Sequence, residues 1–212
     1  MHLSKLLLLA AVLPLATVAQ ASTKISVKPT KAAPLQDGTC RADEWQAATK
    51  LELPAGAFIY LMHDKESLYV CAKGKAEDFA VVDVYVEHAD TGHLHNLHNL
   101  HASAQLGERI FAGEEWSETE FWKLKDWTGF WVPYAGQEET ADGSRTKFLK
   151  GSHREIQVLR NKFPGDTWKV MINVSALNHQ DDDWAEFSYP EKAIDSDVST
   201  WAVLAFAGDA KS

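Results

Sequence analysis

Ala57-Phe58-Ile59-Tyr60-Leu61-Met62 and Leu68-Tyr69-Val70-Cys71-Ala72-Lys73 are the two strongest β-forming runs in this chain. Both are rich in aromatic and β-branched residues, and only the polar segment His63-Asp64-Lys65-Glu66-Ser67 separates them. Two β-forming runs joined by five polar residues predict a β-hairpin. Few residues on either face of the second run are charged, so we expect the hairpin to lie in the middle of a sheet, with both faces covered.

The first 21 residues have the features of an export signal. Lys5 supplies a positive charge, an apolar run follows from Leu6 to Leu13, and Ala19-Gln20-Ala21 has the small-x-small form that signal peptidase accepts. The apolar run is broken by Pro14 and is too short to span a bilayer. The sequence therefore predicts cleavage after Ala21 and a secreted or periplasmic protein without a transmembrane segment.

The charge of the chain argues against nucleic acid as a partner. The 212 residues include 21 basic and 30 acidic side chains, which gives a formal net charge of −9. Loss of the leader removes Lys5 and leaves 20 basic residues against 30 acidic ones, a net charge of −10. Such a surface repels phosphate backbones.

Beyond the leader, the pattern predicts one all-β domain. Residues 22–33 are expected to form a flexible lead-in with an edge strand at Ile25-Ser26-Val27, and the domain is expected over residues 34–212. Val82, Val84 and Val86 alternate with outward-facing polar residues, and further strands are predicted at 147–149, 154–159, 167–173, 184–189 and 200–207. Many short strands without a long amphipathic helix predict an antiparallel β-sandwich, immunoglobulin-like or jelly-roll-like, with short helical turns.

A family resemblance appears near the start of this domain. Asp37-Gly38, Glu44-Trp45 with Ala48, and the strand Leu68-Tyr69-Val70 together resemble the opening of family-nine carbohydrate-binding modules, and equally that of the related DOMON domains. The resemblance covers residues 34–86 and implies a β-sandwich in which the tryptophan packs and the Asp-Gly pair shapes a turn. In such families these residues are mainly structural, so by themselves they assign no function to the chain.

An aromatic segment between residues 105 and 134 supplies the chemistry that a saccharide site needs. Flat rings cover the apolar faces of sugars, while neighbouring charged and polar groups bind the hydroxyls. The alternative is that the rings close the open end of the sandwich core. The candidate ligand-binding residues are Trp116, Trp122, Trp127, Trp131, Tyr134, His101, Glu108 and Arg109.

The two cysteines, Cys40 and Cys71, predict a disulfide. An isolated cysteine pair in an oxidising compartment most simply forms a disulfide, and metal binding by two cysteines without a CxxC spacing is a weaker alternative. The bond would tie the first turn to the second strand of the hairpin and close a loop of about 30 residues, which stabilises a fold by roughly 3–4 kcal/mol.

Histidines and methionines suggest a metal or haem protein as the second class of function. Residues 88–101 contain five histidines, and His93 and His95 would share one face of a strand, where they could chelate a divalent metal with help from Glu87 or Asp90. The alternative is a polar strand and turn. DOMON-type domains include b-type cytochromes, so haem b held by Met62 or Met171 with a histidine is a further alternative.

Catalytic signatures are missing from the sequence. It contains no glycine-rich phosphate loop, no HExxH and no Ser–His–Asp signature. The separation of paired glycosidase carboxylates is a property of the fold, so weak glycoside hydrolase activity stays open at this point. The interpretation that follows is an exported, non-catalytic domain of the carbohydrate-binding type.

Overall fold

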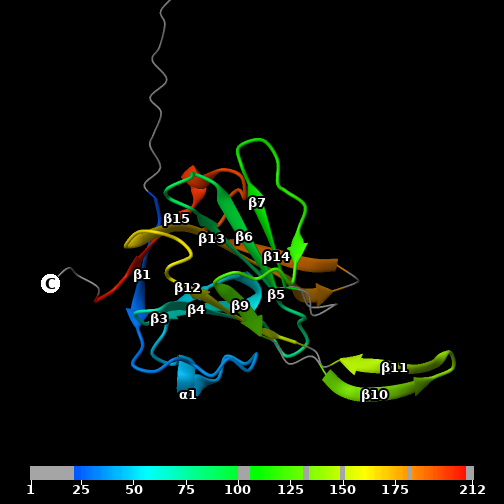
Figure 1. Ribbon diagram of the computed structural model, residues 1–212. Helices are drawn as coiled ribbons and strands as arrows, with labels where there is room; N and C mark the ends of the chain where they lie inside the picture. Colours follow the sequence, from blue (N-terminus) through cyan, green and yellow to red (C-terminus); the bar gives the residue numbers. More distant parts are fainter. Residues whose placement is uncertain (1–21, 100–105, 131–133, 149–150, 181–182, 209–212) are drawn as a thin grey trace, which may run out of the picture.

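The computed structural model describes residues 22–99, 106–130, 134–148, 151–180 and 183–208 (Figure 1). The chain forms an all-β sandwich of two layers, here called sheet A and sheet B. Sheet A contains, in spatial order, β8 (Glu120–Phe121), β7 (Leu106–Phe111), β6 (Leu94–Asn99), β5 (Val81–Glu87), β13 (Thr167–Gln180) and β15 (Ala202–Phe206), with β14 (Asp183–Tyr189) also paired to β13. Sheet B contains β2 (Thr49–Glu52), β3 (Phe58–His63), β4 (Ser67–Lys73), β12 (His153–Leu159) and β9 (Trp127–Phe130).

Strand β1 (Lys24–Pro29) joins the two layers. Its first part pairs with β15 of sheet A and its last two residues pair with β3 of sheet B, in both cases in the parallel direction, whereas the other pairs are antiparallel. Ile25 and Val27 are buried in the core between the sheets. The segment predicted as a lead-in with an edge strand is therefore a central connecting strand from residue 24 onward.

The predicted hairpin is confirmed. β3 and β4 pair in antiparallel register from Phe58–Lys73 to His63–Leu68, and β4 lies between β3 and β12. Leu68, Val70 and Ala72 enter the main core between the sheets. Tyr69 and Cys71 point to the other face, where they pack in a second buried cluster.

The outer face of sheet B is covered by residues 34–48, which include the short helix α1 (Ala42–Trp45). Trp45 packs there beside Met62 and the cysteines. Cys40 and Cys71 form the predicted disulfide, with their α-carbons 5.9 Å apart. The bond and the tryptophan together hold the first turn on the sheet.

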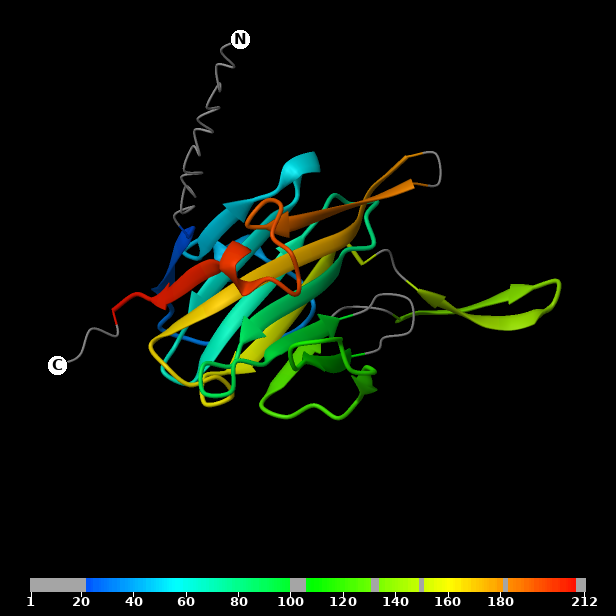
Figure 2. The same ribbon diagram turned by 90° about the horizontal axis from the view of Figure 1, so that it is seen from above.

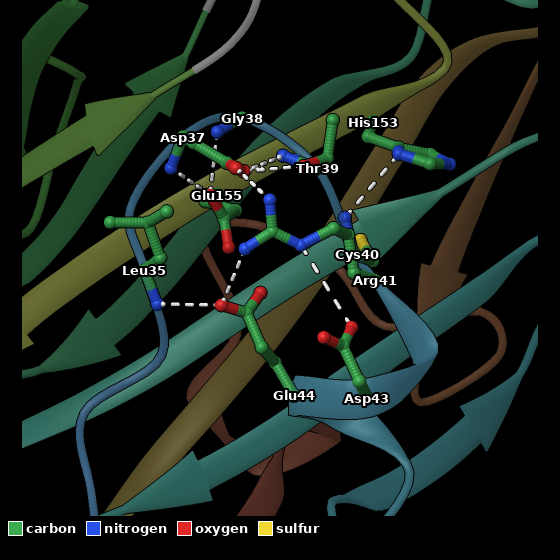
Figure 3. Close-up of polar contacts among 10 residues, drawn as sticks. All are labelled: Leu35, Asp37, Gly38, Thr39, Cys40, Arg41, Asp43, Glu44, His153 and Glu155. Atoms are coloured by element: carbon green, nitrogen blue, oxygen red, sulfur yellow. Dashed lines mark hydrogen bonds and ion pairs between the residues drawn. The ribbon is translucent and has the colours of Figure 1, made fainter.

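Glu155 anchors the loop that carries the Asp37-Gly38 turn (Figure 3). Its Oε2 atom accepts hydrogen bonds from the backbone N–H groups of Asp37, at 2.9 Å, and Gly38, at 2.6 Å. Arg41 then joins Asp37 to Glu44 through ion pairs of 2.6 and 2.8 Å. The turn is therefore hydrogen-bonded to β12 through Glu155, and Arg41 links it to α1 through ion pairs.

The region from residue 107 to 148 is more regular than the sequence indicates. It contains β7, β8, β9 and a hairpin of β10 (Tyr134–Thr140) and β11 (Gly143–Phe148), and residues 138–144, whose polar composition is typical of a loop, form the end of that hairpin. The hairpin projects from the sandwich (Figure 2). Two short 3-10 turns, η1 (Pro54–Gly56) and η2 (Val198–Thr200), complete the fold. Among the described residues, no helix has the length and apolar character needed to cross a membrane.

Candidate functional site

Polar side chains run across five neighbouring strands on the outer face of sheet A. Pairing between β13 and β5 brings Asn173 opposite Asp83, and pairing between β5 and β6 brings Asp83 opposite His98. Asn96 on β6 is in turn opposite Arg109 on β7. These side chains line a depression of about 360 Å³, called here the outer groove, whose lining consists of Asp83, Tyr85, Asn96, His98, Arg109, Thr119, Asn173, Ser175 and Glu186.

The floor of the outer groove is a connected hydrogen-bond network. Asp83 accepts a hydrogen bond of 2.8 Å from the Asn96 amide and is paired with the His98 ring. Asn96 accepts a bond of 2.9 Å from Arg109 Nε. Asp83 is 8% exposed and Asn96 is 1% exposed. Because hydrogen bonds within this network fix the orientation of each side chain, the network presents its donors and acceptors to a ligand in a defined arrangement.

A second polar pair extends the groove across β13 and β14. The Asn173 amide donates to Glu186, at 2.7 Å, and to Ser188, at 3.1 Å. Glu186 is exposed, so its carboxylate has room to accept further hydrogen bonds from a ligand. The groove therefore offers both donors and acceptors along its length.

Aromatic rings lie at both ends of this polar row. At one end the Arg109 guanidinium stacks over the Trp116 ring, 4.7 Å from its centroid, and Trp116 packs edge-on against Tyr85. At the other end, Trp184 is 43% exposed and belongs to the face of β14 that also carries Glu186, two residues away. Burial raises the pKa of Tyr85, with a further contribution from the Asp83 charge, so its phenol keeps its proton.

A second depression of about 460 Å³, called here the inner cleft, opens at the edge of the sandwich core. It is lined by His88, His95, Glu108, Ile110, Ser117, Glu120, Lys123, Lys125, Asp126, Asn161 and Lys162. Glu108 lies at its base, where it is hydrogen-bonded by His95 Nδ1 at 2.7 Å, Trp127 Nε1 at 3.0 Å and Lys162 Nζ at 3.1 Å. Burial by itself would raise the pKa of Glu108, but His95 and Lys162 outweigh it and hold the pKa below its usual value.

The structure divides the predicted saccharide-binding residues between these two sites. Arg109 lines the outer groove and Trp116 packs beside it, whereas Glu108 faces the inner cleft on the opposite side of β7. Trp127 is buried in the main core, and Trp122 is 59% exposed after β8. The sequence-based expectation that Glu108 and Arg109 point into one cleft is therefore corrected, because neighbouring residues of a strand face opposite sides.

Three further predicted residues are not placed in either site. His101 and Trp131 lie outside the described residues, and so does the side chain of Tyr134, whose backbone begins β10. The ligand-binding role assigned to the full set stays a prediction.

Metal and haem binding also remain hypotheses. His93 is exposed in the turn before β6, whereas His95 points to Glu108. Within the described parts of the chain, no group of three or more histidine, cysteine, aspartate or glutamate side chains is arranged to hold a metal ion. Met62 packs beside the disulfide, and Met171 packs with Tyr85 in a third buried cluster.

Sequence reasoning missed most of the outer groove. Asn96, His98, Asn173 and Glu186 were not recognised as members of one site. The alternation that placed Asp83 and Tyr85 outward was the one usable signal, because polar residues on the exposed face of a central strand often mark a binding surface.

Comparison with known proteins gives only distant similarities. No protein-family model matches the sequence, and no curated protein sequence matches it. Two solved structures are similar in shape, both of a family-nine carbohydrate-binding module from Caldicellulosiruptor kristjanssonii. The complex with glucose has a TM-score of 0.45 and 13% identity over 90% of this chain and 98% of that chain. The complex with cellotriose has a TM-score of 0.42 and 12% identity over 85% and 92% of the two chains.

Those modules are of the type that residues 34–86 resemble. At these values of identity and TM-score, the similarity assigns neither a family nor a ligand to this chain.

Proposed function

We propose that the protein is an exported, non-catalytic carbohydrate-binding domain that holds a short saccharide in the outer groove. The observation that carries the proposal is the row of pre-oriented polar groups on the outer face of sheet A, with exposed or half-buried aromatic rings at its ends. The proposal keeps part of the aromatic-rich end predicted from the sequence, since Arg109, Thr119 and Trp116 form one end of the groove.

The chemistry of the groove matches that of a neutral sugar. Each sugar hydroxyl both donates and accepts hydrogen bonds, and the groove offers the Arg109 guanidinium as a donor beside the Asp83 and Glu186 carboxylates as acceptors. The two carboxylates disfavour an acidic sugar. A volume of about 360 Å³ is at the lower end of the roughly 300–1,000 Å³ typical of small-molecule sites, which favours one or two sugar rings.

A binding role is favoured over hydrolysis by the state of Asp83. This carboxylate is buried and already engaged by Asn96 and His98, so it is poorly placed to act as a nucleophile or as a mobile base. Export rests on the leader sequence ending at Ala21, which would deliver the domain to a compartment where glycans are available.

A glycan array followed by calorimetric titration tests the proposal. We expect retention of at least one neutral saccharide and no release of reducing sugar. Arg109→Gln should weaken binding about 10- to 100-fold, because a hydrogen bond to a charged group contributes roughly 1.5–3 kcal/mol. Arg41→Gln, in the segment that covers the opposite sheet, is the matched control and should bind like the unmodified protein.

Two results would count against the proposal. One is a correctly folded protein that retains no glycan and shows no change of tryptophan fluorescence with any sugar. The other is an equal loss of affinity in Arg109→Gln and Arg41→Gln, because that outcome would place the ligand elsewhere.

A further inference from the structure

Two histidines lie side by side at the inner cleft. His88 follows β5 and His95 is on the neighbouring strand β6, and their ring centroids are 5.8 Å apart with an angle of 33° between the planes. The buried Phe163 ring packs edge-on against both imidazoles, at 6.1 and 5.2 Å. A shared aromatic wall therefore holds the pair in place on the side of the core.

The spacing of the two rings allows both imidazoles to bind one ion. A metal–nitrogen bond of about 2.0–2.1 Å, extended to the centre of each ring, puts two coordinated rings roughly 4.5–6.4 Å apart as the angle at the metal widens from about 90° to 180°. The observed separation of 5.8 Å falls within this range.

Glu108 determines which nitrogen of His95 is available. Its Oε2 atom accepts hydrogen bonds from Trp127 Nε1 and Lys162 Nζ, and its Oε1 atom lies 2.7 Å from His95 Nδ1. With the Nδ1 proton directed at Oε1, Nε2 of the neutral ring keeps its lone pair. A carboxylate that orients a histidine in this way is the usual outer partner of a metal ligand.

His88 presents an unexplained buried nitrogen. Its Nδ1 atom is shielded from solvent and finds no hydrogen-bond partner among the described residues. A buried polar atom without a partner is unfavourable, and a metal ion would satisfy this nitrogen directly.

We propose that His88 and His95 form a site for a divalent first-row transition metal, with Cu²⁺ the most tightly bound. Imidazole suits copper and zinc, and the usual order of stability places Cu²⁺ first. The remaining coordination positions face the cleft, where water completes the shell. Lys162 does not oppose the ion with a free charge, because its ammonium lies 3.0 Å from Glu108 Oε1.

This site differs from the one predicted from the sequence. His93 and His95 were expected to share a face of one strand, but His93 lies in the turn before β6 and its carbonyl accepts a hydrogen bond from the His88 backbone. The turn brings His88 to the His95 ring instead. The site is on the core side of sheet A, so it is independent of the proposed saccharide groove on the outer face.

Copper titration of the chain, purified without a polyhistidine tag, tests the proposal. Calorimetry should give one Cu²⁺ per chain, and electron spin-echo spectroscopy of the unmodified protein should show coupling to two imidazoles. His88→Gln and His95→Gln should each weaken Cu²⁺ binding at least tenfold, while His93→Gln, an exposed and matched control, should leave it unchanged. Glu108→Gln should weaken binding by about 10- to 100-fold with both imidazole couplings retained.

The outcomes are distinguishable because the spectroscopic result does not depend on any variant folding. One imidazole coupling or none in the unmodified protein overturns the proposal. So does Cu²⁺ binding that is unaffected by both His88→Gln and His95→Gln, or binding that is lost in His93→Gln. Saccharide binding should be the same with and without Cu²⁺ in each case.

Discussion

Removal of the disulfide has an effect on stability that can be worked out from the position of its cysteines. Cys40 and Cys71 are 31 residues apart, and the chain-entropy relation for a loop of this length gives about 3.7 kcal/mol of stabilisation at 25 °C. For a domain of 150–250 residues, 1 kcal/mol corresponds to roughly 2–4 °C in the melting temperature. We therefore expect loss of the bond to lower Tm by about 7–15 °C.

The measurement compares the oxidised protein with two forms that lack the bond. One is the protein reduced in denaturant and refolded with a reductant, and the other is the double variant Cys40→Ala, Cys71→Ala. Both cysteines are buried, so the variant also loses packing and should melt at or below the temperature of the reduced protein. Circular dichroism followed at two wavelengths would report whether unfolding is cooperative in each form.

The position of the bond also predicts what does not change. The disulfide lies on the outer face of sheet B, whereas the outer groove lies on sheet A. Saccharide affinity below the melting transition should therefore be the same in the oxidised and reduced protein. If Tm falls by less than about 2 °C when the bond is removed, the unfolded chain is already constrained near this loop, and the chain-entropy argument is wrong for this protein.

Two further predictions concern buried groups. Burial, with added repulsion from the Asp37 carboxylate, raises the pKa of Glu155 from 4.5 to about 7. Between these two pH values the carboxyl group is mostly protonated in the folded protein and mostly ionised in the unfolded chain. Stability should consequently fall as the pH rises from about 4.5 to 7, by on the order of 2–3 kcal/mol, and denaturant titrations of Glu155→Gln should lack this decrease. Trp127→Phe keeps a ring in the core but removes the hydrogen bond to Glu108, so it should destabilise the fold by about 1.5–3 kcal/mol in the same assay; an unchanged midpoint would mean that water replaces the indole N–H.

Local patterns in the sequence were sufficient for the centre of the fold. The hairpin β3–β4 followed from two apolar runs around a polar segment, and the burial of Val82, Val84 and Val86 followed from alternation on β5. The disulfide followed from there being only two cysteines in a chain with an export signal. Each of these inferences depends on residues whose environment is set by the strand that contains them.

Other parts of the fold gave weaker or misleading signals for identifiable reasons. A strand is expected between His93 and Gln105, where β6 lies, but its leucines recur at every third position, because Leu94 and Leu97 are buried on opposite faces of one strand, in different clusters. The polarity of residues 138–144 resembled a loop because they form the tip of the projecting β10–β11 hairpin. β1 was mistaken for an edge strand because its two partners, β15 and β3, are distant in sequence.

Local sequence patterns were enough for the class of fold, the central hairpin, the Cys40–Cys71 bond and the segment rich in aromatic residues. The sites depend on how the strands are arranged in three dimensions. Asp83 and Asn173 are 90 positions apart in the sequence, and they meet because β5 pairs with β13. Glu108 and Arg109 are neighbours in the sequence, but they line different sites because a strand directs successive side chains to opposite faces. Secondary structure depends on local periodicity, but a binding site depends on strand order and register, which are set by the packing of the whole sandwich.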